Sequence, residues 1–478
     1  MNKFDKDKAA SIAALLLKDQ KWRMRAVERI DLTSANWCER RRSVHAKELE
    51  SVLLPSGLVS GRNSMRLYLP IGSFHKGPLL DFNVRVAEEP AFLLPRAKHS
   101  RIHVKYLRLL AADAAVEMDA GIEPLLVAIF GFASNPWEVF LQSEVRPSQG
   151  VINSLLCKYL ERYGLPGWNA GPINITAVES WRSSVEMTKG LVRDRAPENM
   201  LSAAENPILA LPHMSVTVPD AASVLALLAD LNIFLAAVLG QVASKDDTKR
   251  KAASRLLDFY ASSGSHWSAI VDCTVSLSTP FMIKTSERRG LNLDSSFPMK
   301  QRSSKQLVAF NDARSNHVSV RVIDMNVELA SPTVLDENSE PIDLTPDFKR
   351  ATPELLSFYD ANPDRPNRIW LHLPLKSSLP ARVSRLVVLT LTATALIAFC
   401  FFVFNWLEIG GTQALTGADI AVILVPSAIA ASLLIVREVS TLSTEINKGW
   451  TLATGGLLLL LWLATLIAYG LNGIDWGE

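Results

Sequence analysis

The chain has 478 residues, of which 48% are hydrophobic, and its formal net charge is only +2. A single core seldom grows beyond about 250–300 residues, so this length predicts more than one domain. The near-neutral charge argues against a protein that coats nucleic acid through general electrostatic attraction. The four cysteines form no CxxC pair, so we expect no metal site, and the sequence implies no cofactor.

The first 30 residues carry apolar side chains at helical spacing and predict an amphipathic helix. The apolar run at residues 12–17 is too short for the central region of a signal peptide. We therefore expect the head to stay in the cytoplasm. A connector is predicted at residues 31–50, after this helix.

The rest of the head predicts an α+β fold in two regions. Residues 1–263 read as a mixed α/β region, with strands at 65–70 and 79–86 and helices at 98–118 and 151–163. Residues 264–375 contain short candidate strands separated by turn signals, which is typical of a β-sandwich-like module. Its last strand, at 368–373, leads almost directly into the first apolar span.

The segment at residues 219–243 is apolar enough to resemble a membrane span. However, Asp230 and Asn232 lie at its middle, and an ionised carboxylate costs several kcal/mol in lipid. We therefore favour a helix buried in the head over a membrane span.

Three basic clusters could hold an anion: Arg40–Arg42, Lys249–Lys251 with Arg255, and Arg288–Arg289. A run of charges usually marks a solvated face, and the functional alternative is a phosphate-binding surface. Lys251 and Arg255 share one helix face because they are four residues apart. The candidate ligand-binding residues are Lys249, Arg250, Lys251, Arg255, Arg288 and Arg289.

No catalytic motif accompanies these clusters. The chain contains no P-loop, GxSxG or HExxH pattern, so we expect a protein that is not an enzyme and has no catalytic residues to name.

Three apolar stretches, at residues 386–405, 420–436 and 451–471, predict a transmembrane domain over 376–478. About 20 apolar residues in a helix span roughly 30 Å of hydrocarbon. Lys376, Arg382 and Arg385 precede the first span, whereas the loop at 406–419 has no Lys or Arg. Because Lys and Arg accumulate on the cytoplasmic side, we expect the head inside and the C-terminus outside.

The spans contain no charged residue between their ends, which argues against an ion-coupled pump or transporter. They do contain small and hydroxyl residues that let helices approach closely. These residues either pack one three-helix unit or line a narrow pore in an oligomer. The candidate packing or pore residues are Thr390, Thr394, Ser427, Ala431 and Ser432.

Four segments of the head resemble uncharacterised bacterial membrane proteins, common in actinobacteria, that pair a cytoplasmic head with C-terminal spans. The segments are residues 68–70, 77–82, 316–320 and 368–373. The overall plan also resembles membrane effectors of bacterial anti-phage signalling, of the Hailong and CBASS types. That resemblance implies a head that binds a nucleotide signal and spans that permeabilise the inner membrane.

Two hypotheses therefore remain open. The leading one is an oligomeric, ligand-gated effector or ion channel of the bacterial inner membrane, in anti-phage defence, whose head senses a nucleotide or oligonucleotide made by a partner enzyme. The alternative is a non-conducting membrane-anchored scaffold that binds a partner.

Overall fold

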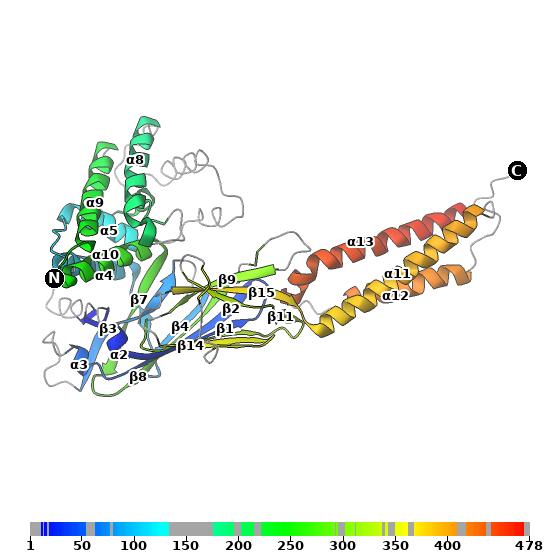
Figure 1. The fold of residues 1–478 in the computed structure, drawn as a ribbon, viewed down its shortest axis with the longest axis horizontal. Coiled ribbons are helices and arrows are strands. Elements are labelled where there is room, and N and C mark those ends of the chain that lie inside the picture. Colours follow the sequence, from blue (N-terminus) through cyan, green and yellow to red (C-terminus); the bar gives the residue numbers. More distant parts are fainter. Residues whose placement is uncertain are drawn as a thin grey trace.

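The computed structural model describes most of the chain. The described residues are 11–12, 14–16, 19–53, 63–76, 80–132, 175–195, 202–214, 221–291, 293–294, 302–310, 312–336, 340–342, 349–361, 368–408, 417–435 and 441–472. The predicted helix at 151–163 lies outside these residues. Figure 1 shows a head of helices and sheets from which three long C-terminal helices project.

An eight-stranded mixed sheet forms the middle of the head, with strand order β13-β14-β10-β1-β2-β8-β4-β5. Its β1–β10 pair is parallel, and its other pairs are antiparallel. Its strands are β1 (Arg23–Leu32), β2 (Trp37–Ala46), β4 (Leu80–Val86), β5 (Glu89–Pro90), β8 (Phe281–Gly290), β10 (Asn316–Val322), β13 (Lys349–Ala351) and β14 (Leu355–Asp360). Since these strands come from both sides of residue 263, the two predicted regions of the head share one sheet.

The N-terminal hairpin β1–β2 corrects the sequence prediction for residues 23–46. We expected the helix to run to residue 30 and a connector to follow, but this segment forms two paired strands. The apolar alternation that usually reveals a strand is weak here, because charged side chains such as Glu28 and Arg40 are buried between the sheets.

Two smaller sheets pack with the first. One contains β3 (Ser64–His75), β7 (His266–Ser276) and β6 (Phe92–Leu93). The other is built around β15 (Arg368–Ser377), which pairs with β9 on one side and with β11 and β12 on the other. These partners are β9 (Arg302–Ala309), β11 (Val327–Leu329) and β12 (Thr333–Leu335).

A helical layer covers the end of the head that lies farthest from the C-terminal helices (Figure 1). Its helices share one apolar core, in which Leu228, Leu256 and Tyr260 are fully buried. The helices are α4 (Arg96–Asp113), α5 (Glu123–Gly131), α8 (Ile175–Val192), α9 (Ala221–Val242) and α10 (Asp247–Ser265).

Helix α9 is the segment that resembles a span, and its residues Ala222–Val242 are long and apolar enough to cross a membrane. In the structure one face of α9 packs into the helical layer. Its two central polar residues fit this position: Asp230 is exposed, whereas Asn232 is buried and donates to the Ser184 carbonyl of α8 at 2.9 Å. The amide oxygen of Asn232 also accepts from Thr188 at 2.6 Å.

Three long apolar helices form the C-terminal region: α11 (Leu379–Glu408), α12 (Gly417–Ile435) and α13 (Thr441–Asn472). In α11 and α13, residues Leu379–Asn405 and Leu442–Gly470 are long and apolar enough to span a bilayer, whereas the apolar part of α12, Ile420–Leu434, is shorter. Many outward-facing residues are large and apolar, among them Ile397, Phe401 and Leu466. A soluble protein rarely exposes such a surface, so the region suits lipid.

Candidate functional site

The joint between the head and the apolar helices is formed by the sheet around β15. Helix α11 begins at Leu379, two residues after β15 ends at Ser377. The backbone N–H of Ser378 donates to the Asn326 carbonyl at 2.9 Å, which ties this short connection to the loop before β11. Rigid structure therefore continues from the sheet into the first apolar helix.

Helix α13 docks on the same sheet before it enters its apolar part. The Ser377 hydroxyl donates to the Asn447 amide oxygen at 2.8 Å, and Arg302 of β9 forms an ion pair with Glu445 at 3.2 Å. The Asp324 carboxylate accepts from the Ser443 backbone N–H at 2.9 Å, and Leu442 is fully buried in the sheet's core. We call these contacts the joint. It attaches both long C-terminal helices to β15.

A cavity of about 40 Å³ lies at the opposite end of β15, where residues of all three sheets meet. The lining includes Gly72 of β3 and Leu307 of β9. Its charged lining residues are Glu28 (β1), Arg40 and Arg42 (β2), Glu287 and Arg289 (β8), and Arg368 (β15). We call this site the arginine cavity.

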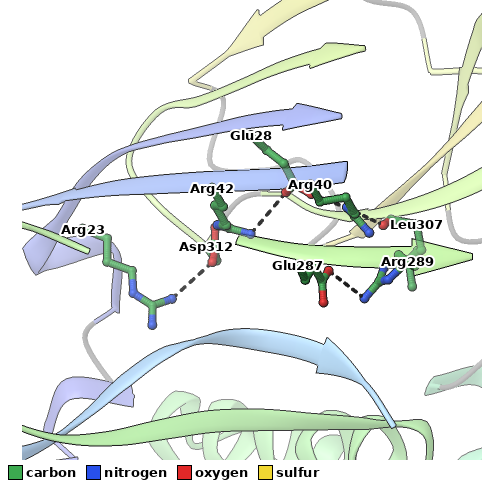
Figure 2. A network of polar contacts seen from close by, with 8 residues as sticks. All are labelled: Arg23, Glu28, Arg40, Arg42, Glu287, Arg289, Leu307 and Asp312. Atoms are coloured by element: carbon green, nitrogen blue, oxygen red, sulfur yellow. Dashed lines mark hydrogen bonds and ion pairs between the residues drawn. The ribbon is translucent and has the colours of Figure 1, made fainter. Parts of the chain in front are cut away.

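The charged groups around the cavity form a network of ion pairs, in which the Glu287–Arg289 pair stands apart from the others (Figure 2). Glu28 pairs with both Arg40 and Arg42, and Arg42 also pairs with Asp312. Asp312 in turn pairs with Arg23 at 3.2 Å. On β8, Arg289 lies 3.4 Å from Glu287.

Burial alone would lower the pKa of Arg40 and of Arg42, but the neighbouring carboxylates raise both pKa values above the ordinary value. Burial would raise the pKa of Asp312, yet Arg42 and Arg23 lower it below its usual value. Arg289 differs, because burial and the positive charge of Arg40 lower its pKa more than Glu287 and Glu28 raise it. The nearby carboxylates therefore compensate the charge of Arg289 less than that of Arg40 or Arg42.

The structure places the arginines of the three basic clusters in different environments, some buried and some exposed. Arg40 and Arg42 are buried, so the interpretation as a solvated face is wrong for them, while Arg41 between them is 60% exposed. Similarly, Arg289 lines the cavity, whereas Arg288 is 54% exposed and pairs with Asp81. Side chains alternate along a strand, so one residue of each pair faces the interior and its neighbour faces solvent.

The cluster on α10 lies elsewhere, at the start of that helix. Asp247 pairs with both Arg250 and Lys251 on the exposed surface, and Arg255 lies one turn further along. Its role as a phosphate-binding surface, together with Lys249, stays a prediction.

The candidate residues of the apolar helices also divide into two groups. Ser427 is fully buried and accepts from the Trp462 indole N–H at 2.8 Å, and Ala431 packs against the contact between the helices. Thr390, Thr394 and Ser432 are exposed, and each hydroxyl donates to a carbonyl of its own helix. Ser427 and Ala431 thus lie within the three-helix unit, and the other three face its surroundings.

The sequence does not reveal the charge network, because Glu28, Arg40, Arg289 and Asp312 are far apart in the chain. Only their pairing across β1, β2 and β8 brings them together. Comparison with protein-family models, curated proteins and solved structures finds no match to this chain.

Proposed function

We propose that this protein is a ligand-gated membrane effector. In this proposal the head binds an anionic, nucleotide-type ligand in the cytoplasm, and the apolar helices of several copies together permeabilise the inner membrane of a bacterium. The observation that carries the proposal is β15, which has the arginine cavity at one end and the joint at the other.

The strand that links the two sites supports this mechanism. Strand β15 has 10 residues, which corresponds to roughly 30 Å at about 3.3 Å per residue. It is the central strand of its sheet, so a displacement at Arg368 is shared with β9, β11 and β12. A hydrogen-bonded sheet resists bending better than a single strand, so movement at the cavity would reach α11 and α13.

The apolar helices support an assembling membrane part. Thr390, Thr394 and Ser432 face away from the three-helix unit, and such residues suit contacts with further copies. The proposed role in anti-phage defence rests on the resemblance of plan to effectors of that kind.

Release of a trapped dye from vesicles tests the proposal. The purified full chain is placed in vesicles, and candidate nucleotides are added to the side of the head. We expect release only with ligand, and we expect it to be lost in Leu442→Asp, which disrupts the joint but leaves the cavity intact. Absence of release with every nucleotide, together with a monomeric state in detergent, would contradict the proposal.

Exchange of the C-terminal helices separates the effector from the scaffold. Three unrelated spans in place of the apolar parts of α11, α12 and α13, with the joint residues 442–447 retained, should abolish the ligand-dependent growth arrest that the effector proposal implies. A scaffold would keep its activity after this exchange.

A further inference from the structure

The arginine cavity has more positive than negative charge. Its charged lining consists of four described arginines and two glutamates. Two further carboxylates act on these arginines: Asp312 pairs with Arg42 and with Arg23, and Asp258 interacts electrostatically with Arg368. Arginine therefore predominates in the lining, and Arg40 is only 5% exposed. A buried lining in which arginine predominates favours an anion over a neutral or cationic ligand.

The arginines also have hydrogen-bond donors left over. The Nε atoms of Arg40 and Arg42 are buried, and neither has a hydrogen-bond partner among the described residues. Most buried polar atoms in folded proteins are paired, so these donors point to an acceptor that enters the cavity. Guanidinium groups match the oxygens of a phosphate in geometry and charge.

The size of the cavity limits which anions can fit. Its volume of about 40 Å³ admits roughly three water-sized groups, which matches the three terminal oxygens of a phosphate monoester. A terminal phosphate carries about −1.5 to −2 charges at neutral pH, whereas a phosphodiester carries only one.

We propose that the arginine cavity binds a terminal phosphate group, either as free phosphate or as the end of a larger ligand. This deepens the proposed function, on which it rests, by naming the charged group that the head recognises. The phosphate contacts Arg40, Arg42 and Arg289 of the eight-stranded sheet and Arg368 of β15, and so draws the two sheets together.

Titration calorimetry on the full chain in detergent tests the inference at constant ionic strength. The probes are inorganic phosphate, adenosine monophosphate and a cyclic dinucleotide that has only phosphodiesters. We expect the first two to bind and the third to bind at least tenfold more weakly. Tighter binding of the monophosphate than of phosphate identifies a nucleotide ligand, and the reverse order identifies free phosphate.

Two neighbouring variants provide a matched comparison. Arg289→Gln removes a cavity arginine and should weaken phosphate binding at least tenfold, whereas Arg288→Gln removes its exposed neighbour and should leave binding unchanged. Arg289→Lys keeps the charge but loses the planar guanidinium, so its affinity should lie between those of the wild type and Arg289→Gln. Thermal unfolding without phosphate shows whether each variant is folded.

Failure of phosphate and monophosphate to bind, or equal weakening by Arg288→Gln and Arg289→Gln, would overturn the inference. Vesicle release without phosphate binding would overturn it and leave the proposed function intact. Phosphate binding without dye release under any ligand would support the inference about the cavity and contradict the proposed function.

Discussion

The helical layer and the arginine cavity are both buried, but different forces hold them. The helical layer packs apolar side chains such as Leu228 and Leu256. Their burial is favourable at any salt concentration and does not require a particular orientation of the groups in contact. The sheets around the cavity meet through ion pairs, in which desolvation offsets much of the attraction. In the proposed mechanism a bound anion changes that balance at the cavity, whereas the apolar helical layer is unaffected by it.

The sharpest test of this contrast is Glu28→Gln, because Glu28 pairs with two buried arginines. Loss of its charge leaves Arg40 and Arg42 undercompensated and should cost about 3–5 kcal/mol of unfolding free energy. Denaturant titration measures this value. Glu39→Gln is the control on the neighbouring strand, since Glu39 pairs with the exposed Arg41 and should cost less than about 1 kcal/mol. Equal effects of the two variants would show that the network contributes nothing special.

Leu256→Ala tests the other side of the comparison. Leu256 is fully buried in the helical layer, and its truncation should cost about 2–5 kcal/mol. Because the lost interaction is apolar, the difference from the wild type should stay constant between low and high salt. A Leu256→Ala effect that depends on salt would break the distinction.

A carboxyl group buried in the helical layer allows a test by pH. Burial raises the pKa of Glu205 to about 8, although Lys189 opposes the shift. The folded state therefore holds this proton more tightly than the unfolded state, so its contribution to stability falls as pH rises from about 4.5 to about 8.

Glu205→Gln removes this titration. We expect the variant to resemble the wild type at pH 5 and to exceed its stability at pH 9, by an amount on the order of a few kcal/mol. Thermal unfolding at both pH values measures the difference. Parallel pH profiles of the two proteins would contradict the assignment.

The smallest expected effect concerns a polar contact at the joint. Asp324 accepts from the Ser443 N–H at the start of α13, as a helix-capping residue does, and Asp324→Ala should cost about 1 kcal/mol. Asp324→Asn keeps an acceptor and should cost less. Denaturant titration compares the two variants, and a loss as large as that of Glu28→Gln would show that the joint also depends on buried charge.

The sequence predicts the parts of this molecule in which local pattern and tertiary environment agree. The apolar helices and strands such as β7 follow from runs or alternations of apolar residues. The hairpin β1–β2 was missed because its inward side chains include charged groups, which are normally assigned to solvent.

The site was harder to predict than the fold. The sequence points to Arg288 and Arg289 together, but nothing local distinguishes the inward from the outward residue. Two carboxylates compensate the charge of the buried Arg40. One is Glu28, which lies 12 residues away in the chain, and the other is Glu287 on the distant β8. Such pairing needs the sheet register, which the sequence alone did not provide.

The docking of α13 has a consequence for biosynthesis. Leu442 lies after α11 and α12 in the chain, yet it is buried in the core of the sheet around β15. A ribosome therefore releases two apolar helices before it supplies the residue that completes this core. A soluble fragment that ends before α11 would expose the apolar surface that Leu442 covers, so maturation of the head is coupled to insertion of its own C-terminal region.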